Sequence, residues 1–213
     1  MKPTININQK SARTEDPIDI ASLINFMELN PADVAQQLTI MEEVVWKKID
    51  VGELLKGDWT KSNKDILAPT IRSYTAHFNK VCLWTQLEIL TTENVRERAK
   101  IIIRFIAIIN NLMSMNNISG ATKIASALNS GPIGKLKQTF KVVNEIQPDA
   151  MATLNKFIDM QQNNNKGFRT LLQSIQPPCI PFLGLYLGDA LYIIDGNKDT
   201  LEDGTINWTK RKL

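Results

Sequence analysis

Apolar side chains recur at every third or fourth position through most of the chain, which is the spacing of one face of an α-helix. Proline or an asparagine-proline pair stands at the start of several of these stripes, as is typical of the first turn of a helix. No segment alternates apolar and polar residues for long enough to require a β-sheet, and the chain has no evident internal repeat. The pattern therefore predicts an all-α protein with helices that start at Asn30-Pro31, Pro69 and Pro148-Asp149.

Capping residues set the expected ends of further helices. Residues 101–109 are apolar nearly all round, so we expect this helix in the middle of a bundle. Thr91-Thr92-Glu93 is expected to cap it, and Asn116-Asn117 to end it. Ser119 is then the expected N-cap of the next helix, and residues 161–166 are expected to form a loop.

Length and composition set the expected domain organisation. A chain of 213 residues with 43% hydrophobic residues can bury one sizeable core, so one domain is the default and two small ones are the alternative. Residues 1–15 are polar and aperiodic, which predicts a flexible tail or linker. Asp16-Pro17 then starts an apolar stripe that predicts a short amphipathic helix. We therefore expect one domain over residues 16–213.

The most distinctive stretch covers residues 176–197. Three prolines between positions 177 and 181 forbid a helix there, so a helix can begin only near Phe182. Gly196-Asn197 is expected to end it, with the glycine in the left-handed conformation that closes the last turn. Between these limits an apolar row ends in a carboxylate, and its members are Leu183, Leu187, Leu191 and Asp195.

A carboxylate at the end of this row does not help the helix itself. Asp195 falls in the last turn, beside the negative end of the helix dipole, at a cost of roughly 0.3–1 kcal/mol. This placement suggests that the charge serves something outside the chain. A polar turn over residues 197–205 and a new element from Ile206, with Asn207 or Thr205 as candidate N-cap, complete a helical hairpin. The predicted fold is a single irregular helical bundle with a protruding helical hairpin near the C-terminus.

Charge and reactive side chains argue against several classes of function. The formal net charge of +3 is too small to indicate nucleic-acid binding, and the basic run Lys210-Arg211-Lys212 is interpreted as a solvated face. Cys82 and Cys179 lack metal-ligand spacing and fit reduced thiols. His77 is the single histidine, and we interpret it as a structural or exposed residue. We therefore expect no metal ion, no cofactor and no covalent catalysis.

Nucleotide-binding and membrane signals are also missing from the sequence. No Gly-rich loop of the Walker type is present, so we do not expect the chain to bind nucleotide by itself. The N-terminus carries no long apolar run that would indicate a signal peptide, and Arg104 interrupts the apolar residues 101–109. The sequence predicts a cytoplasmic protein without direct membrane insertion.

Several segments together resemble the catalytic domain of Ras-type guanine-nucleotide exchange factors, the RasGEF domain. The strongest are Pro177-Pro178-Cys179-Ile180-Pro181-Phe182-Leu183-Gly184-Leu185-Tyr186-Leu187, Asp195-Gly196-Asn197, Ile206-Asn207-Trp208 and Lys210-Arg211-Lys212. Earlier matches are residues 33–39, residues 53–55 with Trp59, Phe78-Asn79 with Trp84 and residues 88–90, residues 126–130 with Ile133 and residues 136–140, and Asn164 with Phe168 and Arg169. The resemblance covers roughly residues 16–213, and separated blocks are more specific than one short motif.

The resemblance implies an exchange factor for a Ras-like small GTPase of the Ras or Rap type. In the family, the hairpin inserts beside the switch regions of the GTPase and promotes release of GDP. By resemblance, Phe182 anchors an apolar contact, Leu191 places an apolar side chain near the magnesium site, and Asp195 places a carboxylate near the phosphate site. The GTPase-contact positions that it implies are Asn79, Ser126, Asn129, Asn164, Phe168, Tyr192 and Gly196.

Two departures from the family pattern leave alternatives open. The family usually has glutamate where Asp195 stands, and aspartate is shorter by one methylene. The family domain continues past residue 212, so we expect its C-terminal part to be missing. A module that binds a GTPase without accelerating release, and a plain helical scaffold, are the alternatives. Asn129 is equally good as a helix C-cap, and Asn79 as a surface group. Recruitment to the cytoplasmic face of the plasma membrane would come through the GTPase or the missing domains.

Overall fold

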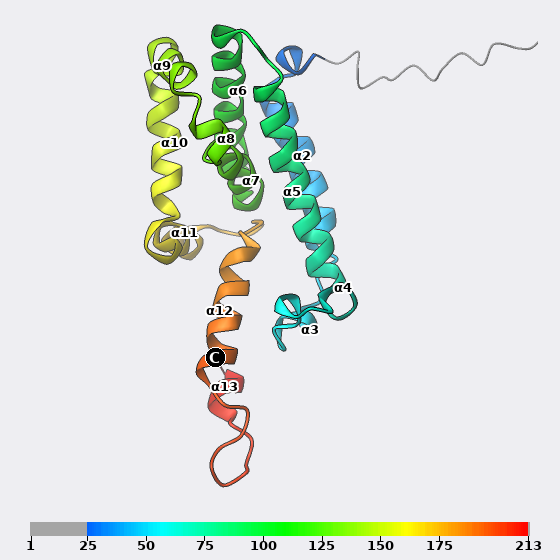
Figure 1. Cartoon of the computed structure of the whole chain (residues 1–213). Coiled ribbons are helices and arrows are strands. Elements are labelled where there is room, and N and C mark those ends of the chain that lie inside the picture. The colour runs from blue at the N-terminus through cyan, green and yellow to red at the C-terminus, as the bar shows by residue number, and fades with distance from the viewer. Residues whose placement is uncertain (1–24, 213) are drawn as a thin grey trace, which may run out of the picture.

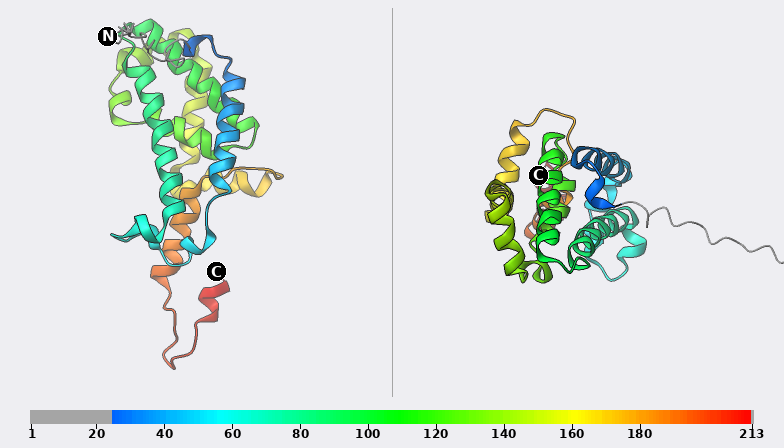
Figure 2. Two further views of the ribbon diagram at one scale, coloured as in Figure 1. Left: turned by 90° about the vertical axis from the view of Figure 1, so that its right-hand side faces the viewer. Right: turned by 90° about the horizontal axis from the view of Figure 1, so that it is seen from above.

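Three layers of helices form the body of the protein in the computed structural model, which describes residues 25–212. The middle layer holds α6 (Val95–Ser114) and α7 (Ile118–Leu128). On one side of it lie α2 (Pro31–Trp46) and α5 (Pro69–Leu90), and on the other lie α9 (Lys137–Ile146) and α10 (Pro148–Met160). The view from above in Figure 2 shows the layers side by side.

Shorter elements connect the layers and extend them. Within residues 25–212 the structure contains no β-strand, only two isolated bridges, so the prediction of an all-α fold is confirmed. The predicted tail over residues 1–15 and most of the helix predicted after Asp16 lie outside the described residues. The remaining elements are η1 (Phe26–Glu28), α3 (Val51–Leu54), η2 (Asp58–Thr60), α4 (Lys64–Leu67), α8 (Gly131–Gly134), α11 (Gln162–Ser174), α12 (Leu183–Gly196) and α13 (Trp208–Lys212).

The core is centred on α6, as its apolar sequence predicts. Ile102, Phe105 and Ile109 are buried on successive turns of this helix. Small residues on α7, such as Ala121 and Ala125, let its backbone approach α6 closely. In the part of the chain that the structure describes, every helix is too short or too polar to cross a membrane.

Two helix caps differ from the prediction. Asn94, rather than Thr91-Thr92-Glu93, caps α6, because its side-chain oxygen accepts the backbone N–H groups of Arg96 and Glu97. Likewise, Asn117 rather than Ser119 caps α7 and accepts the N–H of Gly120 at 2.8 Å. Both errors have one physical cause, since several residues that can cap stand close together and only the tertiary path of the chain selects between them.

A sharp corner joins α10 to α11 where the sequence predicts a loop. Asn163, Asn164 and Asn165 adopt left-handed conformations, with φ of 52°, 57° and 57°, and the chain is regularly helical only after them. Asparagine tolerates this region better than other residues that carry a side chain. Gly167 then passes so close to α10 that an added Cβ would lie 2.6 Å from Cα of Met160. The predicted loop over residues 161–166 therefore includes the corner correctly, but its last residue, Lys166, is already helical.

A buried ionic cluster joins α2, α5 and α7. We call it the Glu42 cluster, and it consists of Glu42, Lys123, His77, Ser119 and Tyr74. One carboxylate oxygen of Glu42 accepts the Ser119 hydroxyl at 2.8 Å, and the other accepts the Lys123 ammonium and lies 3.3 Å from Nε2 of His77. The side chains of Glu42 and Lys123 are 2% and 0% exposed, so the pair is shielded from water. No spacing in the sequence signals this cluster.

The cluster holds Glu42 in its ionised form. Burial alone would raise the pKa of Glu42, but the hydrogen bond from His77, the charge and hydrogen bond of Lys123, and the hydrogen bond from Ser119 together lower it to about 2. Burial lowers the pKa of Lys123, and Glu42 opposes that shift. The carboxylate therefore contributes full stability above its ordinary pKa of 4.5, and that contribution is lost as the pH falls toward 2.

We predict that Glu42→Gln lowers the free energy of unfolding by about 3–5 kcal/mol at pH 7, because Lys123 keeps a buried charge without its counter-ion. The difference from the unmodified chain should shrink between pH 5 and pH 2, where that chain loses the charge of Glu42. Urea unfolding at a series of pH values measures both effects. Glu97→Gln is the matched control, because its ion pair with Lys100 is half exposed and is worth only about 0–1 kcal/mol. Equal losses in the two variants would contradict the prediction.

Candidate functional site

The helix α12 leaves the bundle and projects away from it, and α13 lies beside its far end (Figure 1). The predicted hairpin is therefore present, and α12 begins directly after Phe182 as predicted. Asn207 is the N-cap of α13, since its side-chain oxygen accepts the N–H of Lys210 at 3.1 Å. The predicted left-handed closure of α12 is wrong, because Asn197 is extended and the left-handed glycines of the described chain are Gly57 and Gly204.

Backbone hydrogen bonds fasten the base of the hairpin to the turn between α6 and α7. The N–H of Ile180 donates to the carbonyl of Asn116 at 2.9 Å, and the N–H of Ser119 donates to the carbonyl of Ile180 at 3.1 Å. The side-chain amide of Asn116 donates to the carbonyls of Gln176 and Pro178. The prolines here have no N–H to satisfy, so the N–H of Ile180 and the carbonyls of residues 176, 178 and 180 are enough to attach this segment.

The Phe182 ring packs against α5 and covers the first turn of α12. The Phe182 ring lies against Phe78 of α5, with ring centroids 6.1 Å apart. It also covers Gly184, where an added Cβ would stand only 2.3 Å from the ring. Leu183 and Leu185 on the same turn are buried. Phe182 is therefore half buried by contacts within the chain, and only the rest of its ring can meet a partner.

An ion pair braces the middle of α12 against α11. The two terminal nitrogens of Arg169 donate to the two carboxylate oxygens of Asp189 at 2.8 and 2.7 Å, and Nε donates to the backbone carbonyl of Asn164 at 3.1 Å. This paired hydrogen bond from Arg169 lowers the pKa of Asp189 and raises that of Arg169. The pair is more than a third exposed, so it adds little to the free energy of unfolding. Its two parallel hydrogen bonds nevertheless fix the orientation of Arg169 relative to α12.

The far end of α12 is capped by a cation from α13. Nζ of Lys210 donates to the carbonyls of Ile194 and Asn197 at 3.2 and 2.7 Å and lies 3.2 Å from Asp199. A cation here complements the negative end of the α12 dipole and offsets the unfavourable position of Asp195. The prediction that the basic run is a solvated face is therefore wrong for Lys210, which is buried.

One face of α12 remains open after these contacts. Successive turns of it line a shallow hollow, and its residues are Gly188, Leu191, Tyr192, Asp195 and Gly196. We call it the α12 face. Tyr192 is 82% exposed, and an added Cβ at Gly188 or Gly196 would meet no atom within 4 Å. The face therefore offers apolar surface beside a carboxylate, with two glycines that allow a partner to approach the backbone.

Four of the predicted site residues meet on this face, namely Leu191, Tyr192, Asp195 and Gly196. Gly188 also lines the face but is not among the predicted site residues. Its position three and four residues before Leu191 and Tyr192 is the sequence signal that places it on the same side of the helix.

The other predicted contact residues lie on the body of the protein. Asn79 is exposed on α5, and Ser126 is half buried on α7. Asn129 is exposed and is the C-cap of α7, so the structural interpretation of this residue is confirmed. Asn164 is exposed at the left-handed corner in the first turn of α11.

Phe168 requires a correction. Its side chain is fully buried and packs edge-on against Phe157, with ring centroids 5.2 Å apart. A direct contact with a partner is not available to this ring. Phe168 instead fixes α11 on α10, and thereby positions its neighbour Arg169 for the ion pair with Asp189.

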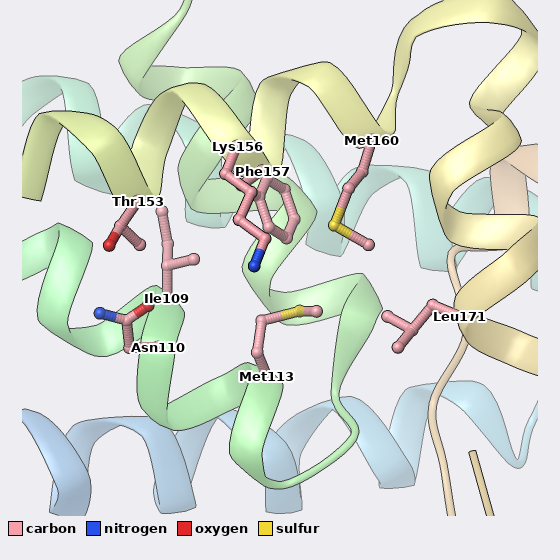
Figure 3. A pocket seen from close by; sticks show the side chains of 8 residues that line it. All are labelled: Ile109, Asn110, Met113, Thr153, Lys156, Phe157, Met160 and Leu171. Carbon is pink, nitrogen blue, oxygen red and sulfur yellow. The ribbon is translucent and has the colours of Figure 1, made fainter. Parts of the chain in front are cut away.

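A second hollow lies in the body, between α6, α10 and α11 (Figure 3). Its walls are mostly apolar, and the ammonium group of Lys156 points into it among Met113, Phe157 and Met160. None of the predicted site residues lines it.

The reactive groups of the described chain offer little for covalent or metal chemistry. Within residues 25–212, no three His, Cys, Asp or Glu side chains gather to hold a metal ion. Cys82 and Cys179 are free thiols. Burial raises the pKa of Cys82 to about 11 against the opposing charge of Lys123, so this thiol is not an activated nucleophile.

Comparison with known proteins finds a matching domain family and several similar proteins. The RasGEF domain family matches residues 33–212. Ras guanine nucleotide exchange factor E of Dictyostelium discoideum is 35% identical over 182 residues, which are 84% of this chain and 18% of that protein. Guanine nucleotide-releasing factor 2 of Drosophila melanogaster is 32% identical over 88% of this chain and 11% of its own length, and Ras-specific guanine nucleotide-releasing factor RalGPS1 of Danio rerio is 33% identical over 81% and 30%. The chain thus spans less than a third of each of these relatives.

Gly184→Ala and Gly188→Ala make the same chemical change one turn apart on α12. We predict that Gly188→Ala raises the protection of α12 amides from hydrogen exchange, because alanine favours the helix by about 0.5–1 kcal/mol and meets open space. Gly184→Ala should lower that protection, because its methyl group displaces the Phe182 ring. Hydrogen exchange measured by mass spectrometry over residues 182–196 checks both. The same direction of change in the two variants would contradict the packing described here.

Proposed function

Because the chain belongs to the RasGEF domain family, we propose that it is a guanine-nucleotide exchange factor for a Ras-like small GTPase and that the hairpin of α12 and α13 acts on the GTPase. The observation that carries the proposal is the α12 face, which stands open on a helix braced at its base, middle and far end. A projecting element that is fixed at three levels can push on another protein without bending back.

The action of such an element is mechanical. A small GTPase holds its nucleotide through a phosphate loop, a magnesium ion and mobile switch segments, so release requires that these contacts be broken. Leu191 brings an apolar side chain to the magnesium site, where a hydrated cation loses its favourable surroundings. Asp195 brings a carboxylate that competes with phosphate for the same positive groups. Both side chains lie on the α12 face, which is available for this contact.

Residues around the hairpin add affinity and orientation. Tyr192 and Gly196 extend the contact on the α12 face, and the exposed part of Phe182 contributes at the base. On the body, the exposed or half-buried side chains assigned to the interface are Asn79, Ser126, Asn129 and Asn164. Phe168 takes part only by holding α11 in place.

Thermodynamic linkage then gives the direction of the effect. If the chain binds the nucleotide-free GTPase more tightly than the loaded form, the affinity for nucleotide falls by the same factor in the complex. Exchange is accelerated for either nucleotide, and the cellular ratio of the two decides which one reloads. The partner is a GTPase of the Ras or Rap type, and through it the chain reaches the cytoplasmic face of the plasma membrane.

The second candidate function is a binding module that docks on a GTPase without accelerating release. The observation that favours it is Asp195, whose carboxylate is one methylene shorter than the glutamate usual in the family. The two candidates share the interface and differ only in the reach of this group.

We predict that Leu191→Ala combined with Asp195→Ala lowers the rate of nucleotide release more than tenfold while the fold is retained. Loss of central contacts at an interface costs at least about 2 kcal/mol, and neither side chain is buried in the core. The measurement is release of a fluorescent guanine nucleotide from a panel of purified Ras-like GTPases. Leu87→Ala combined with Glu93→Ala removes an exposed leucine and an exposed acid elsewhere, and should leave the rate unchanged. Full activity of the first variant would overturn the proposal.

Asp195→Glu separates the two candidate functions. If the shorter carboxylate limits release, the added methylene should raise the rate severalfold with little change in the affinity for the GTPase. The affinity is measured separately, by binding of the nucleotide-free GTPase to immobilised chain. A variant that binds equally well and still leaves nucleotide release at its spontaneous rate would favour the binding module.

A further inference from the structure

The apolar hollow between α6, α10 and α11 has no part in the proposed exchange mechanism, and it shares no residue with the α12 face. Its volume is about 300 Å³, which is at the lower end of the range for small-molecule sites in proteins. Thr153, Phe157 and Met160 follow one another on successive turns of α10, so the hollow runs along that helix. The shape therefore suits a small, elongated molecule.

Most of the lining of this hollow is apolar and deformable. Ile109 and Met113 of α6 stand across from Phe157 and Met160 of α10, and Leu171 of α11 closes the far end (Figure 3). Methionine has an unbranched, polarisable side chain that adapts to the shape of what it contacts. An alkyl chain placed here would leave water, which is favourable in proportion to the apolar area that is buried.

Lys156 is the only ionisable residue in this lining. Lysine usually extends its ammonium toward water, but Figure 3 shows the ammonium of Lys156 pointing into the hollow. Within residues 25–212 no carboxylate pairs with it and no oxygen accepts a hydrogen bond from it. An ammonium has three donors and no acceptor, so the oxygens of a carboxylate are its natural partners and would form charge-assisted hydrogen bonds with it.

Two further polar groups stand at the same end of the hollow as one another, opposite Leu171. They are the side-chain amide of Asn110 and the hydroxyl of Thr153 (Figure 3). Thr153 comes three residues before Lys156 on α10, so the two side chains lie on the same side of that helix. Neither Asn110 nor Thr153 uses its side chain in a hydrogen bond within the described part of the chain. Polar donors at one end and apolar walls toward the other match a molecule with a polar head and an apolar tail.

We propose that this hollow binds an unbranched monocarboxylate of the medium-chain fatty-acid class, taken up as the free acid anion from solution. Its carboxylate pairs with Lys156, and its alkyl chain lies between Met113, Phe157 and Leu171. A cationic amphiphile is repelled by Lys156, and a neutral one binds without the charge-assisted hydrogen bonds. The proposal concerns a site apart from the α12 face and does not depend on the exchange activity proposed above.

Decanoate is the probe that tests the site. Titrated into the whole chain with its methionine methyl groups labelled for NMR, it should shift the signals of Met113 and Met160. The signal of Met41, which is exposed on α2, should stay in place. Decanol has the same chain without the charge and should bind about tenfold more weakly, as expected for the loss of a hydrogen bond to a charged group. Equal shifts of all three methionines, or equal affinities for decanoate and decanol, would overturn the proposal.

Two substitutions of Lys156 test the role of its charge. Lys156→Met should lower the affinity for decanoate about tenfold, to that for decanol, and leave the affinity for decanol unchanged. Lys156→Glu should lose decanoate and bind decylammonium, a gain that misfolding cannot produce. Lys141→Met is the matched control, because it removes an exposed lysine of α9 that does not line the hollow. Equal losses of decanoate affinity in Lys156→Met and Lys141→Met would contradict the assignment.

Two further measurements test the position of the ligand and its source. Bound decanoate would connect Leu171 to α6 and α10, so the amides of residues 168–174 should gain severalfold protection from hydrogen exchange. Lys156→Met at the same concentration of decanoate should gain less. Binding of the chain to phosphatidylcholine vesicles that contain oleic acid, without binding of free decanoate, would show recognition of a membrane surface and overturn the proposal.

Discussion

The buried carboxylate of Glu42 is the constraint on which the rest of the structure depends. It joins residues 77 and 81 positions away in the sequence, Ser119 and Lys123, to a helix near the N-terminal end of the described chain. A charge shielded from water must keep its partners at fixed distances, because any shift leaves it unsatisfied. The positions of α2, α5 and α7 are therefore fixed relative to one another at the place where the hairpin is attached.

The hairpin itself combines three kinds of support that fail under different conditions. Backbone hydrogen bonds at its base depend on neither pH nor salt. The pair of Arg169 with Asp189 is partly exposed and weakens when salt screens it or acid protonates the aspartate. The cap supplied by Lys210 is shielded at the far end. None of these supports uses a residue of the α12 face, which therefore stays open.

The sequence predicts what is decided locally. Helices that begin at Pro31, Pro69 and Pro148 are confirmed because proline fixes its own φ angle and suits only the first turn. The α12 face could be predicted in outline, since helical spacing places Leu191 and Asp195 on one side.

What the sequence does not predict depends on contacts between distant segments. Neither the partners of Glu42 nor the cap from Lys210 has a spacing that could signal them, because the groups lie on different helices. The burial of Phe168 could not be predicted for the same reason. An aromatic residue near a polar corner is equally consistent with a contact to a partner and with a place in the core. The sequence does not distinguish Asn94 and Asn117 as caps from the threonine and serine nearby, because these residues have similar capping propensity.

The corner between α10 and α11 limits how this chain can diverge. Three successive residues there hold positive φ angles, and a glycine follows where the helices touch. Most side chains would raise the energy of each such position by about 1–2 kcal/mol, so substitutions to residues other than glycine, asparagine or aspartate would accumulate strain. The carbonyl of Asn164, which orients Arg169, lies within this corner. A polar surface turn is normally the part of a protein that best tolerates substitution. Here, substitutions in the turn would change the orientation of Arg169 and so the support of the projecting helix α12.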